Sequence, residues 1–264
     1  MEELWKRIGD HTVRFRCIGS EAISHIHQMF GDRPAPIETD RQNSFTITIQ
    51  QGGTRNPGIN TTFSRDNRER LRFERPDYLL IISPDYLEAD IHFYNFVGLR
   101  CVLMNWYSTI IAHFNWGLIV HSSSLVQKGE AHVFAGVSGA GKSTVAQLSH
   151  PRMLLADEAS LVKLSPGGQV MVYDSPLRSD LLSPSRVNCA PLRAIYMLKQ
   201  SPVIQKHPLE RSKALISIFD KIWYWPYDHE ESLKVVRLCR ALVEQVPVYK
   251  LEFQNNDLFW EEIS

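Results

Sequence analysis

One segment of this chain has the residue types and the spacing that bind phosphate. The run from Gly136 to Thr144 reads GVSGAGKST and fits the pattern G-x-x-x-x-G-K-[ST] completely. Glycines permit backbone angles that a Cβ forbids and let phosphate oxygens approach the chain. Lys142 is predicted to reach the β- and γ-phosphates, and the Ser143 hydroxyl is predicted to bind Mg²⁺. The phosphate-binding residues expected from the pattern are Gly136, Ser138, Gly139, Ala140, Gly141, Lys142, Ser143 and Thr144.

The residues on either side of this loop favour a nucleotide site. The apolar run from Ala131 to Ala135 precedes it, and a helix-like stretch from Thr144 to Ser149 follows. A strand that delivers the loop and a helix that leaves it point successive backbone N–H groups into one hollow of anion size. The alternative is a Gly/Ser-rich turn that happens to fit the pattern. The context favours the first interpretation, so we expect the chain to bind a nucleoside triphosphate, with ATP and Mg²⁺ as its cofactors.

Two adjacent carboxylates form a second candidate feature. Asp157 and Glu158 follow the apolar run from Met153 to Ala156. Phosphoryl transfer needs a carboxylate that holds Mg²⁺, directly or through water, and benefits from one that orients or deprotonates the attacking hydroxyl. Neighbouring strand residues point to opposite faces, but both can reach one site where the strand ends. The alternative is an Asp that caps a helix beside a solvated Glu. Together with a complete phosphate loop, the pair is predicted to belong to the site.

His121 is a third candidate. It lies in the run from Leu118 to Ser124, LIVHSSS, which is expected to form a strand shortly before the loop. A single histidine in a strand is more often a satisfied core residue than a catalyst, so the residues alone leave both roles open.

Composition limits the classes of partner. The 264 residues suffice for one large domain or two small ones, and 44% hydrophobic residues support a proper core. Lys+Arg and Asp+Glu both number 29, so zero net charge gives no general attraction to nucleic acid or to an anionic membrane. The first ten residues lack the apolar core of a secretory signal. Four widely spaced cysteines without a C-x-x-C favour free thiols. We expect a soluble cytoplasmic protein with neither nucleic acid nor membrane as a partner.

Residues 1–95 read as a small α/β module of short strands and turns. The stretch SFTITIQ alternates apolar and polar residues with the period of a strand. The expected elements are strands at Thr12–Ile18, Ser44–Gln50 and Tyr78–Ile82, a helix at Glu21–Phe30, and a loop at Gly52–Asn60.

Residues 96–264 are expected to form the phosphate-loop domain. The pattern becomes helical from Tyr86 to Phe114, and two hairpins are predicted, one on each side of the loop. The expected strands are Leu118–Val126, Ala131–Ala135, Met153–Ala156, Leu161–Ser165, Gln169–Tyr173, Ala194–Leu198 and Pro247–Phe253. The expected helices are Glu210–Phe219, His229–Val246 and a last turn at Leu258–Ile263. The fold class is therefore α/β, with a mixed sheet and flanking helices.

The order of these motifs resembles a known family. His121 with its serines, the hairpin, the complete loop, the apolar strand and Asp157–Glu158 follow one another as in HPr kinase/phosphorylase and its kin. The resemblance implies the phosphate-loop fold of the HPr kinase/PEP carboxykinase type. The later runs DSP at 174–176, PLRAIYML at 191–198 and VPVYKL at 246–251 resemble a compact branch of serine kinases encoded beside peptide-modification systems, including lasso-peptide pathways. The resemblance covers roughly residues 115–260.

The resemblance also implies roles for the candidate residues. Asp157 would be the general base for the incoming serine hydroxyl, Glu158 would serve the metal, and His121 would lie near the transferred phosphoryl group. With Lys142, Asp157 and His121 make up the expected catalytic set. The implied activity is ATP-dependent phosphorylation of a serine in a peptide or small protein, such as a peptide natural-product precursor.

Two departures from the family narrow this expectation. The chain has no clear counterpart of the C-terminal signature that HPr kinases use for phosphorolysis and for gripping HPr across a hexamer. Glu158 also replaces the second aspartate of the usual pair. We therefore expect a kinase without efficient phosphorylase activity and a substrate other than HPr, and leave open whether the chain forms a homo-oligomer.

Some assignments stay open at the level of sequence. The aromatic run IWYWPY at 222–227 fits a platform for a peptide substrate and equally fits packing between helices and core. The alternatives to a peptide kinase are a small-molecule kinase, acting on free serine or another metabolite alcohol, and a nucleotide-binding partner protein without catalysis. The Asp157–Glu158 pair argues against the last. The candidates for neutralising the phosphoryl charge are Arg178, Arg186, Arg193 and Arg211.

Overall fold

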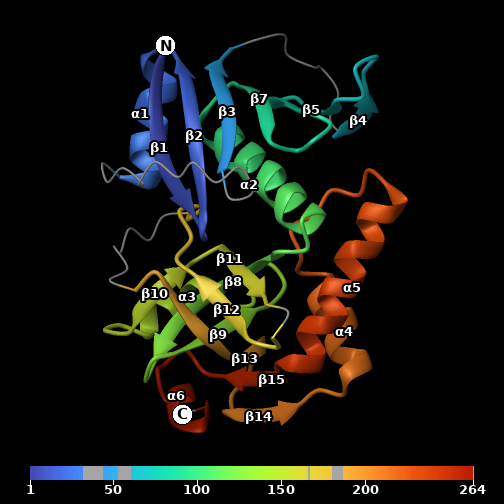
Figure 1. Ribbon diagram of the computed structural model, residues 1–264. Helices are drawn as coiled ribbons and strands as arrows, with labels where there is room; N and C mark the ends of the chain where they lie inside the picture. Colours follow the sequence, from blue (N-terminus) through green and yellow to red (C-terminus); the bar gives the residue numbers. More distant parts are fainter. Residues whose placement is uncertain (32–43, 53–60, 166, 180–186, 264) are drawn as a thin grey trace. The chain divides into compact units, whose positions relative to one another are not determined.

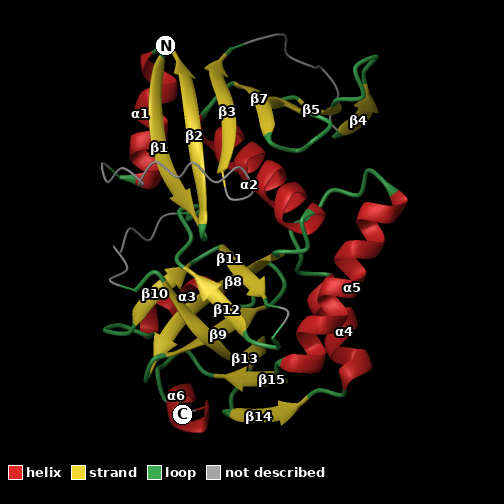
Figure 2. Cartoon of the chain, viewed as in Figure 1, coloured by secondary structure: helices red, strands yellow, loops and turns green. Residues whose placement is uncertain are grey.

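The computed structural model of the protein describes residues 1–31, 44–52, 61–165, 167–179 and 187–263. Its contacts divide the chain into two compact units, Met1–Ile110 and Ile111–Ser264. Each unit is built on its own sheet (Figures 1 and 2). Helix α2 (Phe96–His113) lies almost entirely in the first unit. Within the described ranges, no helix is both long and apolar enough to cross a membrane.

The first unit contains a seven-stranded sheet in the order β1-β2-β3-β7-β6-β5-β4. Strands β2, β3 and β7 run parallel to one another, and the other neighbours are antiparallel. Its strands are β1 (Glu2–Ile8), β2 (His11–Ile18), β3 (Ser44–Gln51), β4 (Thr62–Arg65), β5 (Leu71–Arg75), β6 (Tyr78–Ile82) and β7 (Glu88–Phe93).

This sheet has one covered face and one polar face. In β3, Phe45, Ile47 and Ile49 are buried, whereas the threonines between them lie on the opposite face because strand side chains alternate. Helix α1 (Ser20–Phe30) contacts β2 and β3, and α2 packs on the buried side, where the ring of Trp106 lies 5.8 Å from that of Phe45. The amphipathic strand pattern therefore determines which face receives the helices.

The sequence-based elements of this unit were confirmed at β2, β3, β6 and α1. The helical interpretation of residues 86–95 was wrong, because Glu88–Phe93 forms strand β7 with alternating burial. The helix begins only at Phe96, where Asn95 Oδ1 accepts a hydrogen bond from Gly98 N at 2.8 Å. Strands β1, β4 and β5 were not predicted. Most of the loop expected at 52–60 lies outside the described residues.

The second unit is a mixed sheet ordered β10-β8-β11-β12-β13-β15-β14, with β9 pairing with both β8 and β13. Strands β9, β13 and β15 are parallel and the remaining pairs are antiparallel. The strands are β8 (Gly117–Gln127), β9 (Glu130–Ala135), β10 (Met153–Ala156), β11 (Ala159–Leu164), β12 (Val170–Tyr173), β13 (Cys189–Gln200), β14 (Gln205–Pro208) and β15 (Val248–Phe253). The helices are α3 (Lys142–Leu148), α4 (Arg211–Phe219), α5 (His229–Gln245) and α6 (Phe259–Ile263).

Both faces of the parallel strands are buried. Phe134 and Tyr196 belong to a core cluster with residues of α3 and α6, whereas the adjacent Val133 and Ile195 join a second cluster with α4 and α5. Strands buried on both faces read as continuous apolar runs, which explains why β9 and β13 were recognisable in the sequence. The predicted hairpins β8–β9 and β11–β12, and helices α4 and α5, were confirmed. The predicted strand Ala194–Leu198 is the middle of the longer β13.

Candidate functional site

The loop between β9 and α3 depends on glycines, either for a backbone conformation that other residues rarely adopt or for space. Gly139 and Gly141 have φ values of 77° and 105°, in the region that residues with a Cβ rarely adopt. A Cβ on Gly136 would lie 2.7 Å from the Cβ of Ala140, and one on Gly141 would lie 2.6 Å from Cζ of Phe253. The backbone conformation therefore has the cradle shape that the glycine pattern of a phosphate loop predicts.

Lys142 folds back over this loop. It is the first residue of α3, is only 9% exposed, and donates from Nζ to the carbonyl oxygens of Gly136 and Val137 at 3.2 and 3.3 Å. Burial lowers the pKa of Lys142, and the positive charge of Lys221 lowers it further against an opposing effect of Glu158. Its ammonium group therefore lies in a place that favours an added anion.

Strand β8 joins the loop helix to the carboxylate pair. Ser123 Oγ donates to Lys142 O at 3.1 Å, and Ser122 N donates to Glu158 O at 3.0 Å. Asp157 and Glu158 form the short connection between β10 and β11, and both of these strands pair with β8. Adjacent residues of one strand thus hold the start of α3 on one side and the carboxylate connection on the other.

Asp157 is held in place by a residue that the sequence analysis did not single out. Its carboxylate is 2% exposed, and its two oxygens each accept a hydrogen bond from Ser179. The backbone N of Ser179 donates to Oδ1 at 3.0 Å, and its hydroxyl donates to Oδ2 at 2.8 Å. No motif marks Ser179, because its partner lies 22 residues away in the connection between β10 and β11.

His121 faces a second missed residue, Lys221. The backbone N of His121 donates to Lys221 O at 2.6 Å, and the imidazole lies 5.2 Å from the ring of Trp223. Burial lowers the pKa of His121 to about 4, helped by the charges of Lys142 and Lys221. The imidazole is therefore neutral at neutral pH. Lys221 is 9% exposed and forms an ion pair with Asp220.

The arginines singled out in the sequence lie elsewhere or are engaged. Arg178 donates to the carbonyl oxygens of Leu154 and Leu155 at 3.1 and 3.4 Å and forms an ion pair with Asp174. Arg193 is exposed and lies 3.8 Å from Glu130, at the end of β9 remote from the loop, and Arg211 is exposed at the start of α4. Arg186 lies outside the described residues. Among the described residues, Lys221 is a cation whose charge acts on both Lys142 and His121.

Two oxygen-bearing side chains near the loop are candidate metal ligands. Ser143 is exposed at the start of α3, and Glu158 is partly buried close enough to Lys142 to affect its pKa. Among the described residues, no group of three or more His, Cys, Asp or Glu side chains is arranged to hold a metal ion.

An open hollow of about 790 Å³ lies beside the loop helix α3 and is not lined by the carboxylate pair. It is bordered by Thr144 and Gln147 of α3 and by the ends of β13 and β15. Gln200 also supports the loop directly, since its Nε2 donates to Gly139 O at 3.2 Å. The residues that line the hollow are Thr144, Gln147, Gln200, Ser201, Pro202, Phe253, Gln254 and Asn255. Amide side chains therefore dominate its polar groups.

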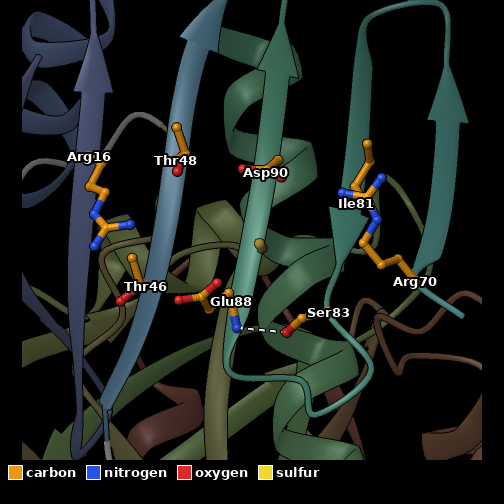
Figure 3. A pocket seen from close by; sticks show the side chains of 9 residues that line it. Arg16, Thr46, Thr48, Arg70, Ile81, Ser83, Glu88 and Asp90 are labelled. Carbon is orange, nitrogen blue, oxygen red and sulfur yellow. Dashed lines mark hydrogen bonds between the residues drawn. The ribbon is translucent and has the colours of Figure 1, made fainter. Parts of the chain in front are cut away.

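A smaller hollow of about 100 Å³ lies on the polar face of the first unit's sheet. Figure 3 shows Arg16, Thr46 and Glu88 on neighbouring strands, with the hydrogen bond of 2.9 Å from Glu88 N to Ser83 Oγ. Arg70, at its rim, is engaged with Asp66 at 2.8 Å. Charges of both signs are interspersed here, as on an ordinary solvated sheet face.

The chain matches a family model and solved structures, but no curated protein. One similar solved structure is the Hpr(Ser) kinase/phosphatase from Coxiella burnetii, with 16% sequence identity and a TM-score of 0.26 over 46% of this chain and 93% of that chain. A family model described as SynChlorMet cassette protein ScmC matches residues 94–264, which include the phosphate loop, both carboxylates and His121. The chain therefore belongs to the family of SynChlorMet cassette protein ScmC.

Proposed function

We propose that this protein is an ATP-dependent kinase that transfers the γ-phosphoryl group to a serine hydroxyl. The observation that carries the proposal is the pair of bonds from adjacent residues of β8. Ser123 bonds the first residue of the loop helix and Ser122 bonds the carboxylate connection. Adjacent residues of one strand thus contact the segment that would bind phosphate and the segment that would accept a proton, and phosphoryl transfer needs these two groups close together.

The chain supplies binding groups for both ends of the nucleotide. The N–H groups of the loop and Lys142 would hold the β- and γ-phosphates. The nucleoside would occupy the hollow that begins at Thr144, where the amides of Gln147 and Asn255 can both donate and accept hydrogen bonds. With the nucleotide in this orientation, its γ-phosphate would point toward Asp157 and His121, away from the hollow.

The groups near the expected γ-phosphate indicate how the acceptor would react. Asp157 would take the proton of the serine hydroxyl while the oxygen forms a bond to the γ-phosphorus and the bond to the β,γ-bridging oxygen breaks, releasing ADP. Lys142 and Lys221 would neutralise charge on the transferred group. His121, neutral at neutral pH, would donate or accept one hydrogen bond without adding charge.

The residues that would hold Mg²⁺ lie at the same two segments that β8 contacts. Ser143 and Glu158 are hard oxygen ligands of the kind that Mg²⁺ accepts, and two protein ligands are enough for an ion that takes the others from phosphate and water. Mg²⁺, when bound there, would offset the charge of the phosphates and of the transferred group.

The test is incubation of the protein with Mg·ATP and serine-containing peptides, followed by mass spectrometry for one added phosphate. The Asp157→Asn variant is the matched control, since it should bind nucleotide and transfer little. If the wild-type protein binds ATP but neither peptides nor free serine gain phosphate, a nucleotide-binding role without transfer becomes the better account.

A further inference from the structure

The segment that follows α4 is extended and lies beside β8. Trp223 N donates to Ile119 O at 2.9 Å, His121 N donates to Lys221 O at 2.6 Å, and Ile222 forms a β-bridge with Val120. Side chains of an extended segment alternate between its two sides. Residues 221–225 are thus sorted into two sets by their pairing with β8.

One set belongs to the core and the other does not. Ile222 and Tyr224 pack against the core cluster that contains α4 and α5. Trp223 instead lies against His121, with ring centroids 5.2 Å apart and planes inclined by 35°. Trp225 stacks on Trp223 at 5.8 Å and 20°. His121, Trp223 and Trp225, here called the aromatic row, are three partly exposed aromatic side chains in successive contact, beginning at His121 in the proposed transfer site.

We propose that the aromatic row binds the phosphate acceptor and that the acceptor is an extended peptide. The inference rests on the proposed kinase function and specifies its substrate class. Under this proposal, alternate residues of the aromatic run serve packing and recognition.

The length of the row favours a peptide over a free amino acid. The steps between successive rings are 5.2 and 5.8 Å, whereas an extended peptide advances about 3.3 Å per residue. The two steps together set the largest span between His121 and Trp225, and an extended acceptor of about three residues covers it. Free serine would contact only the beginning of the row.

The chemistry of the row and its neighbours predicts which peptides bind. Flat indole rings favour aromatic or other apolar side chains, so one is expected two or three residues from the serine. Lys142 and Lys221 both lower the pKa of His121, which shows positive potential at this end of the row. A Lys or Arg directly beside the acceptor serine should therefore be disfavoured.

The experiment uses the full chain and six-residue peptides with one serine and one phenylalanine placed one to four residues away, each paired with its alanine counterpart. With Mg·ATP, kcat/KM should be about tenfold higher for the best phenylalanine peptide than for its counterpart, the scale of one aromatic contact. Trp225→Ala should abolish that preference and leave the KM for ATP unchanged. Trp225→Leu should restore part of it. Tyr227→Ala is the matched control, because Tyr227 belongs to the same run but its ring contacts Tyr224.

A second measurement does not depend on transfer. With 5-fluorotryptophan incorporated, the ¹⁹F signal that disappears in Trp225→Phe belongs to Trp225, and the phenylalanine peptide should shift it in the absence of nucleotide. A shift without phosphate transfer would support the row and count against the kinase proposal. Transfer without a preference for phenylalanine and without a shift would overturn the row and leave the kinase standing. A weaker affinity for ATP in Trp225→Ala, with peptide binding unchanged, would assign the row to the nucleobase and also overturn the proposal.

Discussion

Ser179 donates to both carboxylate oxygens of Asp157, one bond from its backbone nitrogen and one from its hydroxyl. The two bonds fix the plane of a carboxylate that is almost completely buried. A base that is held in this way does not need to reorient when an acceptor arrives, which is the usual benefit of a preorganised site.

Replacing Ser179 should therefore impair catalysis more than binding. Ser179→Ala removes the hydroxyl bond and keeps the backbone bond, so we expect kcat to fall about tenfold, the effect of one hydrogen bond to a charged group. The KM for ATP should not change. Ser179→Thr keeps a hydroxyl and should recover most of the rate. An equal loss in both variants would indicate a steric role for this residue.

The two adjacent carboxylates should respond differently to neutral replacements. Asp157→Asn should cut transfer by about 10²-fold or more, as expected for loss of a general base, with Mg·ATP affinity nearly intact by calorimetry. Glu158→Gln should raise the Mg²⁺ concentration needed for half-maximal rate. If the two variants showed the same Mg²⁺ dependence, the division of roles between them would be wrong.

Two glycines with positive φ allow a matched test of the phosphate loop. Gly141→Ala should abolish ATP binding, because its Cβ would meet Phe253 in a conformation that is already strained. Gly129→Ala carries similar strain, with φ of 83° and no neighbour within 4 Å, in the β8–β9 turn. It should cost about 1–2 kcal/mol of stability and leave ATP affinity unchanged. Retained ATP binding by a folded Gly141→Ala would contradict the loop assignment.

Lys142→Ala tests the charge of the loop separately from its shape. Loss of the ammonium group removes the contact expected with the β- and γ-phosphates, so ATP affinity and turnover should both collapse. Circular dichroism and thermal melting would verify that the variant is folded. If folded Lys142→Ala bound ATP as tightly as the wild-type protein, the assignment of the phosphate loop would be wrong.

The pKa of His121 gives a pH-dependent test. Because this pKa is lowered to about 4 in the fold, the unfolded chain binds the proton more tightly. His121 therefore contributes stability that is complete above the unfolded pKa of roughly 6.5 and is lost as the pH falls toward 4. The free energy of unfolding, measured by denaturant titration between pH 4 and 7, should depend less steeply on pH in His121→Gln than in the wild-type protein.

Bound nucleotide should raise the pKa of His121, whereas the fold alone lowers it. The phosphate charge near Lys142 should raise the pKa of His121, as followed by NMR of the ring protons. His132 is a matched control, since burial also lowers its pKa to about 4 but it lies on β9 beside Arg193. A pKa of His121 that does not change with saturating ATP would separate this residue from the phosphates.

Local patterns were enough to predict much of the second unit. Its hairpins have glycine-containing turns, and its parallel strands are continuous apolar runs, so periodicity identified them. Strand β7 was missed because Glu88, Asp90 and His92 occupy a polar face and the segment runs directly into a long helix. Ser179 and Lys221 could not be predicted, since Asp157 and His121, their respective partners, are far from them in the sequence and are brought near only by the tertiary fold. The roles of the site residues remain predictions.

The Phe253 ring fills the space beside Gly141, and this has a consequence for synthesis of the chain. Phe253 is the last residue of β15, which pairs in parallel with β13, and its ring lies where a side chain at position 141 would stand. The floor of the phosphate loop is therefore made by a strand that leaves the ribosome long after the loop itself. We expect a nascent chain to remain unable to bind nucleotide until β15 has docked, so that phosphoryl transfer begins only in a completed second unit.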